Sequence, residues 1–124
     1  WSTPAGYVAN FAQKDDLVLF NASWVQIAFD YYFESYEDLY SIQVEKRGVP
    51  GDMFDSGTLE PKMTESDIPR LIALMNGHDR VWLVYSHNWY TDPMGLIPQT
   101  LDSKMELTRQ RDFYGGRVQL YETP

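Results

Sequence analysis

Two apolar runs decide the fold of this chain: Leu17-Val18-Leu19-Phe20 and Val81-Trp82-Leu83-Val84-Tyr85. Both runs are rich in residue types that favour strands. Continuous apolar runs of this length are typical of strands that helices cover on both faces of a sheet. The sequence therefore predicts two fully buried strands, and the other elements are interpreted outward from them.

Helical patterns flank both runs. Segment 3–12 opens with a Thr-Pro pair suited to a helix start and repeats apolar residues at helical spacing. Residues 22–33 carry the same spacing and predict a second helix, although their residue types also favour a strand. In segment 64–77, Thr or Ser caps a third helix that ends at Asn-Gly. Asp92-Pro93 predicts the start of a fourth helix.

Two more strands are predicted where apolar and polar residues alternate. Residues 40–44 have a period of two, which indicates a strand with one polar face near a sheet edge. Residues 117–121 alternate after a Gly115-Gly116 turn and predict an edge strand. Residues 47–63 contain three glycines and two prolines and predict a long loop, a kind of segment that is often functional.

Strands separated by helices imply right-handed crossovers. The sequence therefore predicts a single α/β domain over residues 1–124, whose length suits one domain. We expect a three-layer, mostly parallel sheet of four or five strands flanked by helices, with a Rossmann-like or flavodoxin-like outline.

The composition excludes several function classes. The formal net charge of −8 argues against a nucleic-acid partner, because neutralising phosphates needs clustered Lys and Arg. The chain has no cysteine, which excludes disulfides and cysteine-based zinc sites. Its longest uncharged run, residues 17–29, is shorter than the roughly 20 apolar residues of a membrane span.

Familiar catalytic and cofactor motifs are absent from the sequence. It contains no dinucleotide-binding glycine fingerprint, no phosphate-binding loop and no nucleophile elbow around a serine. With His78 and His87 alone, a zinc site has too few nitrogen ligands. We therefore predict no catalytic residue, no metal and no cofactor.

Ligands of open α/β sheets bind beyond the carboxyl ends of the strands. The ligand-binding candidates at or near the predicted strand ends are Asn21, Ser23, Arg47, Ser86, His87, Trp89 and Tyr90. Ser86 and His87 have the chemistry of a nucleophile and a base, but neighbours on a strand point to opposite faces. In the alternative interpretation, His87 and Asn88 satisfy backbone groups of a turn.

Aromatic residues near these ends offer a platform for a sugar ring or an isoprenoid. They are Trp24, Tyr31, Tyr32, Trp89 and Tyr90. The alternative is that they belong to the core, which aromatic side chains dominate in most proteins. The core interpretation is favoured for Trp24, whereas Trp89 and Tyr90 lie in a polar loop, which leaves both interpretations open for those two.

Two further patterns have simple structural interpretations. Asp30, Glu34, Glu37 and Asp38 have the oxygen ligands of a hard cation, but such runs are commonly a solvated helix face. Asn21-Ala22-Ser23 matches the N-glycosylation pattern, which we interpret as a coincidence at the end of a buried strand.

Several phrases of this sequence resemble a known family. They are DDLVLFNASW at residues 15–24, VEKRGVP at 44–50 and RVWLVYSH at 80–87, with support from residues 1–8 and 113–121. They look like the C-terminal soluble region of bacterial multi-pass membrane glycosyltransferases, relatives of the dolichyl-phosphate-mannose protein mannosyltransferases. The resemblance covers almost the whole chain, but its motifs are strand-and-turn phrases and not catalytic signatures.

The resemblance implies a parent enzyme that moves a sugar from a polyprenyl-phosphate carrier to an acceptor outside the cytoplasm. The family's catalytic acid lies in the membrane part, and no position here matches its motif. The chain is then expected to be a non-catalytic accessory domain on the periplasmic side, excised from a larger protein at Trp1 and tethered by an N-terminal membrane domain. Its expected partners are that membrane domain and a lipid-linked sugar or glycan acceptor.

Two alternatives from other function classes stay open. One is a small α/β hydrolase-like enzyme that uses His87 with Ser86, Asp92 or Asn21. The other is a carbohydrate-binding or protein-binding module that uses Trp89 with Tyr90.

The net negative charge is concentrated in one segment. Residues 30–67 hold ten acidic residues against three basic ones. Because acidic surfaces are repelled by anionic headgroups, we expect this flank to point away from the membrane, with Arg47 on the side facing the active site.

Overall fold

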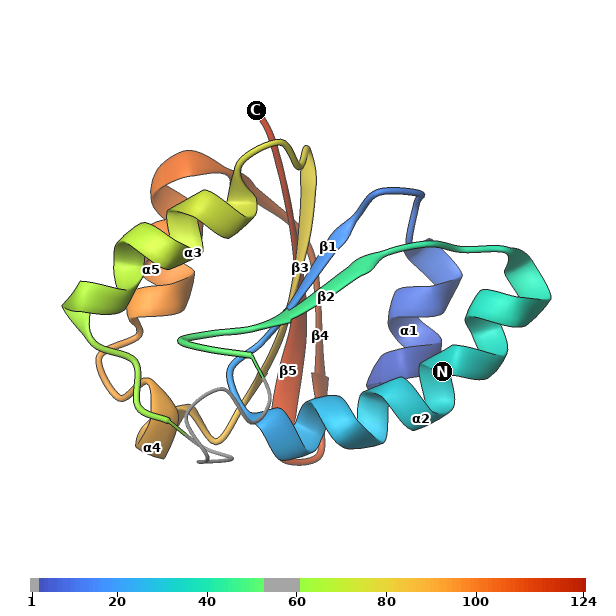
Figure 1. The fold of residues 1–124 in the computed structure, drawn as a ribbon, viewed down its shortest axis with the longest axis horizontal. Helices are drawn as coiled ribbons and strands as arrows, with labels where there is room; N and C mark the ends of the chain where they lie inside the picture. The colour runs from blue at the N-terminus through green and yellow to red at the C-terminus, as the bar shows by residue number, and fades with distance from the viewer. Residues whose placement is uncertain (1–2, 53–60) are drawn as a thin grey trace.

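One mixed sheet organises the computed structural model, which describes residues 3–52 and 61–124 (Figure 1). The strands of the sheet are β1 (Leu17–Phe20), β2 (Glu45–Gly48), β3 (Arg80–Ser86), β4 (Glu106–Phe113) and β5 (Gly116–Glu122). The helices are α1 (Pro4–Phe11), α2 (Ser23–Tyr40), the short 3₁₀ helix η1 (Glu65–Asp67), α3 (Ile68–Met75), α4 (Asn88–Thr91) and α5 (Leu96–Lys104). The strand order is β2-β1-β3-β5-β4.

The sheet is parallel on one side and antiparallel on the other. Strands β2, β1 and β3 pair in parallel, whereas β5 pairs antiparallel with both β3 and β4. The α/β class is therefore confirmed, but the expected mostly parallel sheet is wrong. The reason is the hairpin that joins β4 and β5 through Tyr114 and Gly115, since strands joined by so short a turn must run antiparallel.

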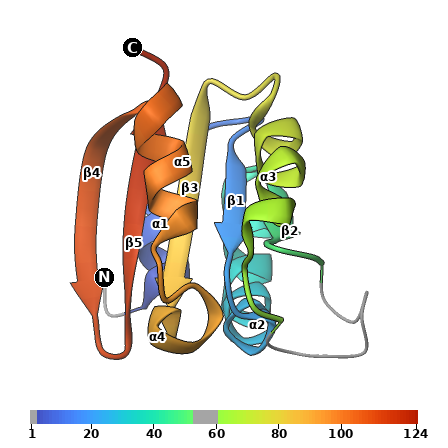
Figure 2. The same ribbon diagram turned by 90° about the vertical axis from the view of Figure 1, so that its left-hand side faces the viewer.

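The two apolar runs form buried strands, as the sequence predicts. Leu19 and Leu83 face a core cluster built with α3 and α5, whereas Val18 and Trp82 face a second cluster built with α1 and α2. All four side chains are fully buried. Helices thus lie on both faces of the sheet, α3 and α5 on one and α1 and α2 on the other (Figures 1 and 2).

The predicted helix starts and stops are confirmed for α1 and α3. The Thr3 hydroxyl accepts a hydrogen bond from the Gly6 N–H at 3.1 Å, which caps α1. Thr64 and Asp67 form a reciprocal capping box at η1, directly before α3. The chain leaves α3 through Asn76 and then Gly77, whose φ of 87° is a left-handed conformation that favours glycine.

The alternation over residues 40–44 does not form a strand. Helix α2 continues to Tyr40, whose ring stacks on that of Tyr36 one helical turn earlier. Ile42 and Val44 then pack against the core beneath α1 and α2 as part of an irregular connection. Strand β2 begins at Glu45, and its position at a sheet edge agrees with the prediction.

The C-terminal strands also differ from the prediction. Residues 117–121 do not lie at an edge, because β5 sits between β3 and β4 and buries Val118, Leu120 and Tyr121. The edge is β4, which the sequence did not predict. Its residues are almost all polar, because its side chains are exposed on both faces from Glu106 to Asp112 and no apolar face is needed.

Helix α5 begins later than predicted. The short helix α4 precedes it, and Gly95, with φ 66°, turns the chain directly before Leu96. The Asp92 carboxylate nevertheless accepts hydrogen bonds from the N–H groups of Leu96 at 2.8 Å and Ile97 at 3.0 Å. The Asp92 side chain therefore supplies acceptors for the first turn, but the N-cap residue is Gly95, so the predicted start at Asp92-Pro93 is wrong.

Part of the predicted loop over 47–63 lies outside the described residues, which leave out 53–60. Val49 and Met63, on either side of that gap, are both buried in the core cluster beneath α3 and α5. Within the described part of the chain, we find no helix that is both long enough and apolar enough to cross a bilayer.

Candidate functional site

The Asn21 side chain, directly after β1, forms hydrogen bonds with the carboxyl end of β3. Its amide nitrogen donates to the Ser86 carbonyl and to the Thr91 hydroxyl, and its amide oxygen accepts from the Ser86 N–H at 2.8 Å. The side chain is only 2% exposed. Asn21 therefore joins the strand ends and the start of α4, and its buried nitrogen is not available as a glycosylation site.

The two candidate serines are also built into the scaffold. Ser23 is buried at the first residue of α2. The Ser86 hydroxyl donates to the Gly115 carbonyl at 3.0 Å, which attaches the end of β3 to the β4–β5 turn. A hydroxyl has one proton to donate, so Ser86 is not activated by a hydrogen bond to His87.

His87 lies in a strained turn between β3 and α4. Its φ of 50° is left-handed, a conformation that costs a residue with a side chain roughly 1–2 kcal/mol. This conformation turns the chain sharply. As a result, the His87 carbonyl accepts hydrogen bonds from the N–H groups of Tyr90 and Thr91 in α4. Such strain is often found at functional sites.

The His87 ring brings two tryptophans together. It lies edge-on to the Trp24 ring, with centroids 4.7 Å apart, and its centroid is 6.0 Å from that of Trp89. Trp24 comes from the first turn of α2 and Trp89 from α4, so elements far apart in the sequence meet here. Trp24 is 42% exposed and Trp89 is 72% exposed, which shows that they do not belong to the core.

A groove opens beside this aromatic cluster. Two adjoining cavities, of about 350 Å³ and about 520 Å³, lie between the end of β3 and the β4–β5 hairpin. The residues that line both cavities are Tyr85, His87, Phe113, Gly115, Gly116 and Arg117. We call this feature the β3-end groove. Its volume lies in the range of small-molecule pockets, about 300–1,000 Å³.

The groove combines an aromatic wall with a polar wall. Trp24 lines the smaller cavity, and Trp89 lines the larger one. Asp112 and Arg117 also line the larger cavity, where the Arg117 guanidinium donates to the Asp112 carboxylate at 2.8 Å and both side chains are exposed. Aromatic rings can stack on the C–H face of a sugar, while planar charged groups can bind its hydroxyls.

The remaining aromatic candidates are exposed but differ in position. Tyr90 is 41% exposed, and Lys62 lies over its ring with the ammonium 4.7 Å from the centroid. Tyr31 and Tyr32 contact each other further along α2, with ring centroids 5.3 Å apart. Of the predicted platform, the contacts therefore join Trp24 and Trp89 through His87, and Tyr90 to Trp89, whose ring centroids are 6.0 Å apart.

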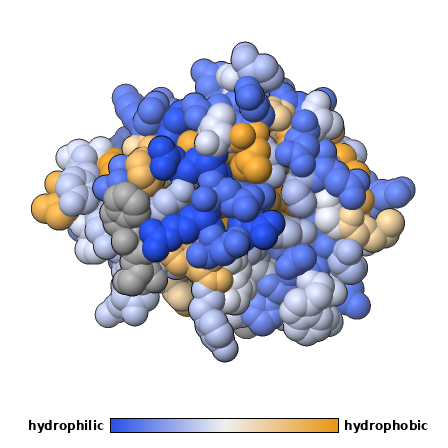
Figure 3. All heavy atoms as spheres, turned by 180° about the vertical axis from the view of Figure 1, so that it is seen from behind, coloured by the Kyte–Doolittle hydropathy of each residue, from blue (hydrophilic) through white to orange (hydrophobic). Residues whose placement is uncertain are grey.

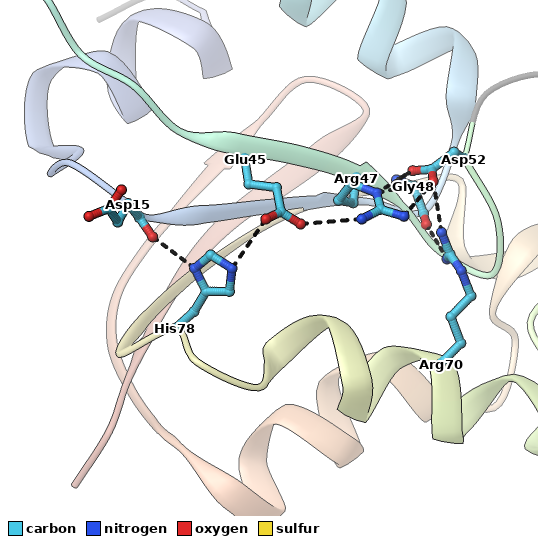
Figure 4. Close-up of polar contacts among 7 residues, drawn as sticks. All are labelled: Asp15, Glu45, Arg47, Gly48, Asp52, Arg70 and His78. Atoms are coloured by element: carbon cyan, nitrogen blue, oxygen red, sulfur yellow. Dashed lines mark hydrogen bonds and ion pairs between the residues drawn. The ribbon is translucent and has the colours of Figure 1, made fainter.

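Arg47 belongs to a separate cluster on the α3 side of β2. Its guanidinium donates to the Asp52 carboxylate from Nε, at 3.0 Å to each oxygen, and from Nη2, at 2.8 Å, and it also donates to Glu45 (Figure 4). Arg70 donates to the same Asp52 and to the Gly48 carbonyl. Partial burial opposes ionisation of Asp52, but the hydrogen bonds from Arg47 and the Gly48 N–H outweigh it and lower the pKa of Asp52.

His78 extends this cluster toward the other end of the sheet. Its Nδ1 lies 2.8 Å from the Asp15 carbonyl, and its Nε2 lies 3.5 Å from the Glu45 carboxylate (Figure 4). The contacts of Arg47 and His78 therefore hold β2 and the turns around it. They do not place Arg47 in the lining of the β3-end groove.

Two of the four acidic residues of α2, Asp30 and Glu37, lie in ion pairs. Lys46 lies 2.7 Å from the Glu37 carboxylate and 3.6 Å from that of Asp30. Burial raises the pKa of the Asp30 carboxyl, although Lys46 acts in the opposite direction. In the described segments, no three His, Asp or Glu side chains gather closely enough to hold a metal ion.

Sequence reasoning missed the hairpin wall of the groove. Asp112 and Arg117 face each other across β4 and β5, and Ser86 binds Gly115 in the turn between these strands. The Gly115-Gly116 pair signals a turn in the sequence, but without β4 nothing indicates that the turn packs against β3.

Searches of protein-family models and of curated proteins find no match to this chain. The functional assignment therefore rests on the geometry of the groove and on the resemblance of the sequence phrases.

Proposed function

We propose that this chain is a non-catalytic binding domain whose β3-end groove holds a saccharide. The observation that carries the proposal is the pair of exposed tryptophans, Trp24 and Trp89, that His87 brings together beside the Asp112–Arg117 ion pair. Such a surface stacks on a sugar ring and binds its hydroxyls at the same time.

The contacts around His87 favour binding over hydrolysis. The hydrolase alternative needs Ser86, Asp92 or Asn21 as a partner of His87. The Ser86 hydroxyl donates to Gly115, and both polar atoms of the Asn21 amide are hydrogen-bonded to Ser86 or Thr91. The Asp92 carboxylate is buried and accepts from the Tyr85 hydroxyl at 2.7 Å and from the first turn of α5.

The sequence resemblance supports a wider role for such a domain. We propose that it is an extracytoplasmic accessory domain of a polyprenyl-phosphate-sugar-dependent membrane glycosyltransferase, tethered on the periplasmic side by an N-terminal membrane domain. There the groove would position the glycan acceptor or the lipid-linked sugar. The acidic segment would point away from the membrane. We further infer a three-layer, Rossmann-like outline for the half of the fold around β2, β1 and β3.

A fluorescence titration tests saccharide binding. We expect neutral oligosaccharides from a mixed panel to change the tryptophan emission saturably, because Trp24 and Trp89 are exposed at the groove. The Trp89→Ala variant should weaken this binding about tenfold or more, since it removes a stacking surface. Tyr31→Ala is the matched control, because it removes an exposed aromatic ring of α2 and should leave the titration unchanged.

A flat titration across the whole panel would overturn the saccharide assignment. The non-catalytic assignment has its own test, incubation of the isolated chain with a polyprenyl-phosphate sugar and an acceptor. We expect no transfer, and robust turnover would contradict the proposal.

A further inference from the structure

Strand β4 is an open edge of the sheet. In the described part of the chain it pairs with β5 alone, and every residue from Glu106 to Asp112 is exposed. Seen from behind, hydrophilic side chains gather over the middle of this face, where β4 runs (Figure 3). An edge strand presents a row of backbone N–H and C=O groups that another strand can use.

Two arginines of β4 are held in place by aromatic rings. The Arg109 guanidinium lies 3.6 Å from the centroid of the Phe11 ring. The Arg111 guanidinium lies 5.8 Å from the centroid of Tyr7 and 5.1 Å from that of Phe113. Because the two arginines are two positions apart on one strand, they share the α1 side of the sheet. Stacking on rings orders a guanidinium without using its hydrogen-bond donors.

These two arginines differ from the other arginines of the chain. Arg47, Arg70, Arg80 and Arg117 all lie in ion pairs. Over residues 3–52 and 61–124, no ion pair is formed by Arg109 or Arg111. Glu122, which feels the charge of Arg109, already binds Arg80 and the Thr108 hydroxyl. The β4 edge therefore offers cationic donors that form no ion pair with a carboxylate of the described residues.

We propose that an extended acidic peptide pairs with β4 as a sixth strand, with carboxylates at alternate positions binding Arg109 and Arg111. Backbone pairing along an open edge supplies affinity in this mode, and the alternating side chains supply specificity. Residues 104–117 hold four basic residues against two acidic ones, so this edge attracts acidic partners although the whole chain is acidic. This proposal is independent of the saccharide groove.

A second copy of the chain does not suit this edge. Antiparallel pairing of two β4 strands centred on Gln110 would place Arg109 of one copy opposite Arg111 of the other, and like charges directly opposite destabilise a sheet. The arginines therefore disfavour self-pairing and select a partner of opposite charge.

Fluorescence anisotropy with a labelled peptide of alternating Glu and Thr tests the proposal. We expect saturable binding that the double variant Arg109→Gln/Arg111→Gln weakens about tenfold or more. Lys14→Gln/Lys62→Gln is the matched control, because it removes the same charge from two exposed lysines outside residues 104–117 and should leave binding nearly unchanged. Circular dichroism of each variant verifies that the fold is retained.

Three chemical controls separate strand pairing from simple charge attraction. We expect a peptide of alternating Lys and Thr not to bind. The acidic peptide methylated at alternate backbone nitrogens should lose binding, because it keeps the carboxylates but cannot pair. Inorganic phosphate at the same anion concentration should not displace the peptide.

Binding that survives the double variant or the methylation, or that phosphate abolishes, would overturn the proposal. Trp89→Ala should bind the peptide normally, so the two binding claims fail or succeed separately.

Discussion

Asp16 connects three segments that meet where β1 and β3 begin. Its buried carboxylate accepts hydrogen bonds from the Trp82 indole at 2.9 Å, the Arg80 guanidinium at 3.1 Å and the Gln13 N–H at 2.9 Å. Arg80 also donates to the Phe11 carbonyl at the end of α1. A charge buried to 2% exposure is tolerated here because every donor around it is satisfied.

We predict that Asp16→Asn lowers the free energy of unfolding by about 3 kcal/mol, the lower end for breaking a buried pair, because Arg80 keeps Glu122 as a partner. Urea unfolding followed by tryptophan fluorescence measures the change. The control is Asp112→Asn, which breaks the exposed pair with Arg117 and should cost less than about 1 kcal/mol. Equal losses in the two variants would contradict the role given to Asp16.

For single residues, the sequence predicts the location of the candidate site well, but it does not predict what each residue does there. Rules for strand ends bring Asn21, Ser86 and His87 to one place, and the structure places all three at the ends of β1 and β3. The division of roles is not visible in the sequence. It depends on long-range hydrogen bonds, such as that from Ser86 to Gly115, whose partner belongs to a hairpin with a weak sequence signal.

At the scale of elements, burial decides which strands the sequence reveals. β1 and β3 are covered on both faces, so their apolar runs are unmistakable. β4 is exposed along nearly its whole length, and its polar sequence carries no alternation that predicts a strand. The end of α2 is also hard to predict. Residues 40–44 alternate as a strand would, but Tyr40 still belongs to the helix.

The turn between β4 and β5 depends on the backbone conformation of Gly115. Gly115 has a φ of 82°, and no atom lies within 4 Å of the position that a Cβ would occupy. Gly115→Ala should therefore cost about 1–2 kcal/mol through backbone conformation alone, without a clash. Gly115→Asn should cost less, since Asn adopts this conformation more readily. Thermal unfolding measures both variants, and a loss for Asn as large as that for Ala would contradict this explanation.

For the whole molecule, the two edges of the sheet differ in charge. Around the β2 edge, several acidic residues pair with basic ones: Glu37 with Lys46, and Asp52 with Arg47 and Arg70. The β4 edge instead presents Arg109 and Arg111 stacked on aromatic rings. The β3-end groove lies at the carboxyl end of β3, between these edges. The two proposals thus assign a neutral sugar and an acidic peptide to separate surfaces of the molecule.

The indole N–H resonances of the protein, recorded by two-dimensional NMR during a saccharide titration, test the groove most directly. Trp24 and Trp89 lie at the groove, whereas Trp82 is fully buried and hydrogen-bonded to Asp16. The proposed function predicts saturable shifts of the Trp24 and Trp89 resonances, while that of Trp82 stays in place; single-tryptophan variants assign the signals. Unmoved Trp24 and Trp89 resonances at saturating saccharide would contradict it.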